Sequence, residues 1–185
     1  MKITQTALPE VLLIEPDVHS DDRGFFLETW HAKKYAAAGL DAQFVQDNHS
    51  RSRRGTLRGL HAQLHKPQGK LVRVTLGEIF DVAVDIRQGS PTFGQHAGVH
   101  LSADNFRQLW IPEGYAHGFF VVSETVEFLY KCTDVYDPTG DIMIRWDDPA
   151  IGIAWPTKDP LLSERDRDAR LLAEHDASEL PVYSK

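Results

Sequence analysis

The stretch FDVAVDIR, residues 80–87, decides the fold class of this 185-residue chain. Its side chains alternate, so that one side of an extended strand carries Phe80, Val82, Val84 and Ile86 and the other carries Asp81, Ala83, Asp85 and Arg87. Similar short runs recur at 95–101, 107–112, 118–123, 126–136 and 141–146. Turn-forming residues separate them at 88–91 (QGSP), 112–114 (PEG) and 137–140 (DPTG). Many short strands at this spacing predict an all-β sandwich or barrel.

Helix-forming sequence is scarce. The segment HAKKYAAAG at 31–39 predicts one short helix that ends at a glycine. Residues 163–175 predict short helical turns, with Ser163 as the N-cap. The segment AWPTKDPLLS at 154–163 is expected to pack back over the strands. Because no internal repeat, low-complexity tract or linker interrupts the chain, we expect a single domain over residues 1–185.

Bulk composition limits the possible partners. A formal net charge of −7 argues against general nucleic-acid binding, which needs a broad basic face. The apolar run near the amino terminus, in MKITQTALPEVLLIEP, is too short for a signal peptide or a membrane span. A single cysteine, Cys132, excludes an internal disulfide framework and a multi-cysteine zinc site. We therefore expect a cytoplasmic protein that binds neither nucleic acid nor membrane.

Positive charge is nevertheless concentrated in one part of the chain. Four arginines fall within eight positions, and three further basic residues follow; the set is Arg51, Arg53, Arg54, Arg58, Lys66, Lys70 and Arg73. A local basic cluster in an acidic protein fits a small anionic ligand better than a polymer. A solvated charged loop is the alternative, above all for Arg53 and Arg54.

The richest segment for chemistry is TLRGLHAQLHKPQGKL at 56–71. His61 could accept or donate a proton near neutral pH, and Arg58 and Lys70 suit an anion bound or formed nearby. A second histidine, His117, lies in IPEGYAHGFF at 111–120, where a turn leads into an apolar strand. Three imidazoles, those of His61, His65 and His117, would also suffice for a zinc or iron site. The spacing leaves acid–base chemistry, metal binding and a structural role open.

Two further regions could complete a reactive pocket. If Phe128 and Tyr130 point inward from their strand, Lys131 points outward, and the tyrosine is either a core residue or a proton donor. Near the carboxyl terminus, Asp166 or Asp168 could orient a histidine through a hydrogen bond. Simple solvation of both aspartates is the alternative reading.

Seven segments together resemble the dTDP-4-dehydrorhamnose 3,5-epimerase family. They are DDRGFFLETW (21–30), FVQDNHSRSRRGTLRGLHAQ (44–63), KLVRV (70–74), FDVAVDIR (80–87), LSADN (101–105), WIPEGYAHGF (110–119) and EFLYKCTDVY (127–136). The similarity runs from about residue 3 to 166, and several independent motifs make it specific. It implies a cupin-type jelly roll with a few short helices, a homodimer, and catalysis without a metal or an organic cofactor.

The resemblance also implies a substrate and catalytic roles. The substrate is a dTDP-linked 6-deoxy-4-ketohexose, whose C3 and C5 protons are α to the C4 carbonyl. His61 resembles the base, Asp166 the carboxylate that orients it, and Lys70 the cation near the enolate oxygen. Tyr130 resembles the acid that inverts C5.

Binding residues follow from the same resemblance. Phosphate or sugar contacts are implied for Arg23, Arg58 and Arg165, and a sugar contact for His117. Nucleotide contacts are implied for Gln46, Asp47, Asn48 and Asp141, with Tyr136 stacked on thymine and Glu28 reaching in from the partner subunit. A relative that epimerises only C3 or only C5, or a ketoisomerase, fits the same positions, and a metal-dependent or non-enzymatic cupin is the remaining alternative.

Overall fold

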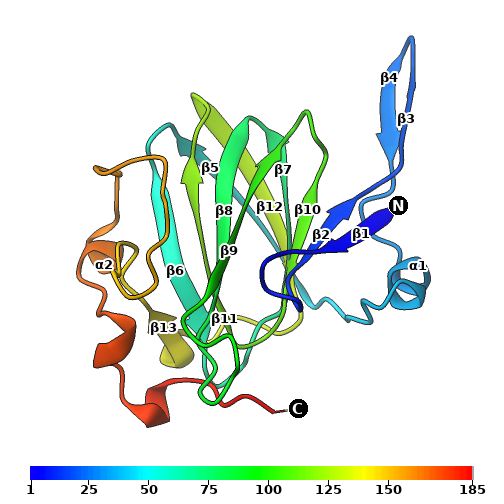
Figure 1. Ribbon diagram of the computed structural model, residues 1–185. Helices are drawn as coiled ribbons and strands as arrows, with labels where there is room; N and C mark the ends of the chain where they lie inside the picture. Colours follow the sequence, from blue (N-terminus) through cyan, green and yellow to red (C-terminus); the bar gives the residue numbers. More distant parts are fainter. Residues whose placement is uncertain (185) are drawn as a thin grey trace.

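Two antiparallel β-sheets pack face to face in a computed structural model that describes residues 1–184 (Figure 1). The six-stranded sheet has the order β1 (Lys2–Gln5), β2 (Leu12–Glu15), β10 (Gln108–Ile111), β7 (Lys70–Leu76), β12 (Thr125–Cys132) and β5 (Gln46–Arg53). The five-stranded sheet has the order β13 (Asp141–Met143), β6 (Leu57–Gln63), β11 (Tyr115–Val121), β8 (Glu78–Asp85) and β9 (His96–Ser102). The predicted all-β, cupin-like sandwich is confirmed.

The main core lies between the two sheets. Val72, Val74 and Phe128 enter it from the six-stranded sheet, and Ile79 and Phe119 enter it from the other. All five side chains are at most 5 % exposed. Burial of this apolar area is the chief force holding the sheets together, at roughly 25 cal/mol for each Å² removed from water.

A second core covers the outer face of the five-stranded sheet. There Val82, Val84 and Ile86 of the 80–87 stretch pack against Leu172 and Leu180 from the C-terminal segment, drawn in orange and red in Figure 1. The alternation in FDVAVDIR is therefore confirmed, but both faces of the strand are buried. The set containing Asp81 and Asp85 points into the sandwich, where both carboxylates are fully buried.

The C-terminal segment returns over the strands as expected. Trp155 packs on Phe80 with ring centroids 5.8 Å apart, and Leu161 forms a parallel bridge with Thr56. Helix α2 (Glu164–Arg167) follows, and Ser163 caps it by accepting a hydrogen bond from the backbone N–H of Asp166 at 3.1 Å. Three short 3₁₀ turns occupy Pro138–Gly140, Leu172–Glu174 and Ala177–Glu179.

The other helix, α1 (Ala32–Ala37), ends before Gly39, as the sequence predicts. Gly39 has a φ of +93°, a conformation that glycine adopts without strain. No helix in residues 1–184 has both the length and the apolar character needed to cross a membrane.

A two-stranded hairpin projects from the sandwich. It consists of β3 (Val18–Asp21) and β4 (Gly24–Leu27) and stands apart from both sheets in Figure 1. Phe25 and Phe26 on this arm are 60 % and 70 % exposed. Adjacent exposed aromatic side chains on an isolated hairpin are typical of a surface that binds another molecule.

Candidate active site

A cavity of about 250 Å³ opens between the two sheets and collects most of the residues singled out by sequence. One wall belongs to the five-stranded sheet, the opposite wall belongs to the six-stranded sheet, and the segment around α2 closes one side. Its lining residues are Arg58, His61, His117 and Phe119, then Ser50, Lys70, Phe128 and Tyr130, and finally Ser163 and Asp166.

His61 on β6 is held by a buried carboxylate. Its Nε2 lies 2.5 Å from Oδ1 of Asp166, whose other oxygen accepts a hydrogen bond from the hydroxyl of Ser163 at 2.7 Å. Burial alone would raise the pKa of Asp166, but hydrogen bonds from His61 and Ser163 and the charge on His61 bring this pKa below its ordinary value. With Nε2–H donated to Asp166, the other ring nitrogen, Nδ1, is left for a ligand.

Two glycines allow His61 and His117 to stand side by side. The two histidines are cross-strand partners on β6 and β11, next to a register shift in that pairing. Gly59 has a φ of +119°, and a Cβ on it would lie 2.5 Å from Cα of Gly118. The backbones of β6 and β11 therefore approach each other here more closely than residues with a Cβ atom would permit. Both imidazoles consequently face the same space.

Lys70 and Tyr130 stand on the opposite wall. Lys70 is 9 % exposed, and its Nζ opens to the cavity without a hydrogen-bond or ion-pair partner among residues 1–184. Burial lowers the pKa of Lys70, while the charges of Cys132 and Asp81 act in the other direction. Burial raises the pKa of Tyr130, so the phenol keeps its proton at neutral pH.

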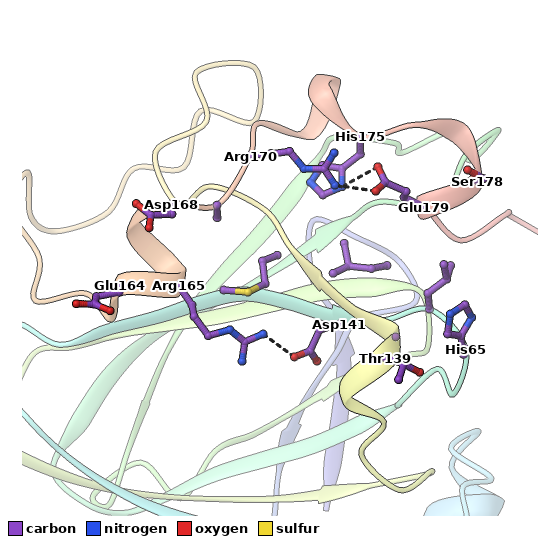
Figure 2. A pocket seen from close by; sticks show the side chains of 15 residues that line it. His65, Thr139, Asp141, Glu164, Arg165, Asp168, Arg170, His175, Ser178 and Glu179 are labelled. Atoms are coloured by element: carbon purple, nitrogen blue, oxygen red, sulfur yellow. Dashed lines mark hydrogen bonds and ion pairs between the residues drawn. The ribbon is translucent and has the colours of Figure 1, made fainter.

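A second group of polar residues is centred on Asp141. Its carboxylate accepts hydrogen bonds from Gln63 at 2.5 Å, from the Tyr136 hydroxyl at 2.7 Å and from Arg165 at 2.8 Å. Figure 2 shows Arg165 reaching from α2 to Asp141 on β13. This hydrogen bond to Asp141 is the main cause that raises the pKa of Tyr136.

Gln46 and Asn48 join this group from β5. The side chain of Gln46 donates to Oδ1 of Asn48 at 3.2 Å and accepts from the backbone N–H of Tyr136 at 2.9 Å. The Tyr136 ring, 49 % exposed, is thus held at the surface by its backbone and by its hydroxyl. An exposed but fixed aromatic ring is suited to stacking against a flat ligand.

A larger hollow of about 730 Å³ lies beyond the Arg165–Asp141 pair (Figure 2). Of its arginines, Arg165 pairs with Asp141 at 2.8 Å and Arg170 pairs with Glu179 at 2.9 Å. His61, Lys70 and Tyr130 do not line it. The reactive side chains therefore occupy the smaller cavity, and size alone does not mark the site.

Some predicted residues lie elsewhere. Arg23 lies in the turn of the projecting hairpin and pairs with Asp21, and Glu28 directly follows β4 and pairs with Lys34. The carboxylate of Asp47 bonds to Lys131 at 2.8 Å, on the opposite face of β5 from Gln46 and Asn48.

The positions of two further residues, His65 and Asp168, separate them from the site around His61. His65 and Asp168 line the larger hollow, so Asp166 is the aspartate that orients His61. His65 does not join His61 and His117, and residues 1–184 contain no group of three or more His, Cys, Asp or Glu side chains arranged to hold a metal ion.

Sequence reasoning missed two polar residues of the site. Asp81 bonds to His117 from β8, and Gln63 braces Asp141 from β6. No sequence signal marked Asp81, because the alternation at 80–87 groups it with Asp85 and Arg87 on the polar side of the strand.

An interior cavity lined by histidines, a lysine and a tyrosine, inside two facing antiparallel sheets, defines a cupin-like enzyme. A family model described as dTDP-4-dehydrorhamnose 3,5-epimerase matches residues 5–174. The enzyme of that name from Pseudomonas aeruginosa is 58% identical over 178 residues, covering 95% of this chain and 98% of its own. The chain belongs to the dTDP-4-dehydrorhamnose 3,5-epimerase family, and is an isomerase.

Two further relatives bear on its specificity. The dTDP-6-deoxy-D-glucose-3,5-epimerase of Legionella pneumophila, solved in complex with dTDP-4-keto-L-rhamnose, superposes with a TM-score of 0.97 at 52% identity and covers 100% of this chain and 99% of its own. The dTDP-4-dehydrorhamnose 3-epimerase of Streptomyces niveus is 39% identical and covers 100% of this chain and 90% of its own.

Proposed function

We propose that this protein converts dTDP-4-dehydro-6-deoxy-D-glucose to dTDP-4-dehydro-L-rhamnose by inverting C3 and C5 of the sugar. Membership of the epimerase family and the ligand of the Legionella pneumophila structure support this substrate class. The observation that carries the proposal is the placement of His61 on one sheet and of Tyr130 and Lys70 on the other, across one cavity. Inversion of a carbon needs removal and return of a proton on opposite faces, which this arrangement allows.

His61 is the base in this mechanism. The protons on C3 and C5 are α to the C4 ketone, so removing either one gives an enolate. Asp166 accepts the Nε2–H of His61, which leaves the Nδ1 lone pair to abstract the proton. The carboxylate of Asp166, itself buried and fixed by Ser163, then stabilises the imidazolium that forms.

Lys70 stabilises the enolate. Its ammonium group, without a partner among residues 1–184, would be satisfied by the C4 oxygen as negative charge develops there. A buried cation exerts a stronger attraction than one in water, because less solvent screens it. Electrostatic stabilisation of this kind is commonly worth a factor of about 10²–10³ in rate.

Tyr130 returns the proton at C5. Its hydroxyl lines the cavity and keeps its proton at neutral pH, since burial raises the pKa of this phenol. Because β12 stands opposite β6, a sugar ring between the strands would present one face to His61 and the other to Tyr130.

The remaining polar residues bind the nucleotide sugar. Arg58, whose Nε donates to Ser52 at 3.1 Å, and Arg165 are suited to the diphosphate. The fixed ring of Tyr136 is suited to stacking on thymine, with Gln46, Asn48 and Asp141 around it. His117 is suited to a sugar contact.

A second copy of the chain completes the site. Arg23 lies in the turn of the β3–β4 arm, which carries the exposed Phe25 and Phe26, and Glu28 follows the arm directly; burying those rings in a homodimer would carry the arm over a neighbour. Replacing Phe26 with Ser should shift the protein from dimer to monomer in sedimentation and raise KM for the nucleotide sugar. A monomeric wild-type protein would contradict this part.

The label pattern in D₂O tests the substrate and the reaction together. Incubation with dTDP-4-dehydro-6-deoxy-D-glucose should place deuterium at both C3 and C5, and the product should be a substrate for a dTDP-4-dehydrorhamnose reductase. Label at C3 alone would instead give the activity named for the Streptomyces niveus relative, and formation of a 3-keto sugar would indicate a ketoisomerase. Either result would overturn the 3,5-epimerase assignment.

A further inference from the structure

Asp81 is a fully buried carboxylate one layer behind the cavity. It lies on β8, pairs in register with β11, and points into the sandwich alongside Ile79 and Ala83. Both of its oxygens lie near Nε2 of His117, at 2.9 and 3.1 Å. No other hydrogen-bond donor contacts this carboxylate among residues 1–184.

The other fully buried carboxylate of the same strand is satisfied quite differently. Asp85 accepts hydrogen bonds from the guanidinium and backbone N–H of Arg87 and from the hydroxyls of Ser90 and Thr92. That network ties together the end of the strand and the loop after it, which is a structural role. Asp81 has one donor only, so this single contact offsets only part of the free-energy cost of burying the carboxylate.

His117 is held with one nitrogen fixed and the other free. The ring stacks on Phe128 with centroids 6.0 Å apart and an interplanar angle of 23°, and its side chain is 8 % exposed. Nε2 faces Asp81, whereas Nδ1 has no partner among residues 1–184 and opens onto the cavity. Asp81 therefore requires the proton on Nε2, and the lone pair of Nδ1 is presented to the ligand.

We propose that Asp81 is a positioning residue that fixes the tautomer and orientation of His117, so that Nδ1 accepts a hydrogen bond from a hydroxyl group of the sugar. The inference rests on the proposed function for the identity of the ligand, because it assigns His117 to a hydroxyl rather than to the ketone. A ketone oxygen has no proton to donate, so the lone pair of an unprotonated Nδ1 would repel it. Binding the ketone would require the opposite orientation of the His117 ring, with an N–H facing the ligand.

The first test is spectroscopic and needs no substrate. In the full-length protein labelled with ¹⁵N-histidine, long-range ¹H–¹⁵N correlation at neutral pH should show His117 protonated on Nε2 and unprotonated on Nδ1; His117→Asn identifies the signal. In Asp81→Asn the Nε2–H proton should move upfield or a second tautomer should appear, because an amide oxygen is a weaker acceptor than a carboxylate. Asp104→Asn, which removes an exposed carboxylate from the loop after β9, should leave the signal unchanged.

A protonated Nδ1 in the wild type would overturn the proposal, as would identical His117 signals in the wild type and Asp81→Asn. The wild-type spectrum decides the first point even where Asp81→Asn fails to fold.

The second test is a double-mutant cycle on turnover. Asp81→Asn should lower kcat/KM by about tenfold to a hundredfold, the loss expected for a charge-assisted hydrogen bond. If Asp81 acts through His117, then Asp81→Asn combined with His117→Asn should lose no more than His117→Asn alone. Losses that multiply would overturn the proposal. A wild-type enzyme inactive on the dTDP sugar would instead contradict the proposed function, while the spectra would still test the role of Asp81.

Discussion

Replacing Lys70 with Met should make the protein more stable and nearly inactive. The side chain is 9 % exposed and its ammonium group has no partner among residues 1–184, so the folded state holds a poorly solvated charge. Met has a similar length and removes that charge. Replacing buried ionic groups with apolar ones can stabilise a protein by about 1–4 kcal/mol, and we expect about 1–2 kcal/mol here because the cavity still admits water.

The expected gain can be measured by calorimetry. For a chain of this size, each 1 kcal/mol shifts Tm by about 2–4 °C, so Lys70→Met should melt about 2–8 °C above the wild type. Turnover should fall by about 10²–10³-fold, as for the loss of one group that stabilises an oxyanion. Lys158→Met, at an exposed position, is the matched control and should change neither Tm nor turnover.

The pH dependence of this gain has a definite sign. Burial lowers the pKa of Lys70 in the folded state, so folding carries the full cost of the charge below that lowered pKa. The cost disappears as the pH rises toward 10.5, the ordinary lysine value, because the unfolded chain then also loses the proton. The difference in Tm between Lys70→Met and the wild type should therefore shrink as pH rises. A Lys70→Met variant that is less stable than the wild type, or that keeps more than about a tenth of wild-type turnover, would contradict this prediction.

Three further changes test neighbouring parts of the site. Asp166→Asn should lower kcat by about tenfold to a hundredfold; since the folded-state pKa of Asp166 is lowered, the wild type should lose stability as pH falls below about 4 and the variant should lose less, as followed by acid unfolding. Gly118→Ala should cost about 1–3 kcal/mol in urea unfolding, because the new Cβ would lie 2.8 Å from the carbonyl oxygen of Arg58. Tyr130→Phe should retain deuterium exchange at C3 but lose inversion at C5, as followed by NMR in D₂O.

Much of the sandwich could be predicted from periodicity, but one edge could not. The runs at 80–87 and 126–136 alternate clearly and form β8 and β12. By contrast β5, with the sequence QDNHSRSR, has no apolar alternation, and its strand conformation depends on pairing with β12 along its whole length. Strand formation there is decided by a distant partner strand, which the local sequence does not contain; in the His49–Glu127 contact, for example, the two residues are 78 positions apart.

The candidate site divides in the same way. His61 and Lys70 lie in one motif, and the resemblance to the epimerase family is enough to predict the roles of both residues. Spacing alone does not distinguish Asp166 from Asp168; the resemblance implies Asp166, and a four-residue helix turns its side chain toward a histidine 105 positions earlier. Asp81 could not be assigned from the sequence, because alternation places it on a polar face without indicating that this face lies inside the sandwich.

Deuterium exchange by the His61→Ala variant shows whether His61 is the base for both proton abstractions. The variant, checked for the wild-type fold by circular dichroism, is incubated with dTDP-4-dehydro-6-deoxy-D-glucose in D₂O, and label is measured at each carbon by NMR. If His61 is the base for both abstractions, neither C3 nor C5 should take up deuterium above the rate without enzyme. Substantial exchange at either carbon would remove His61 from that role and contradict the mechanism.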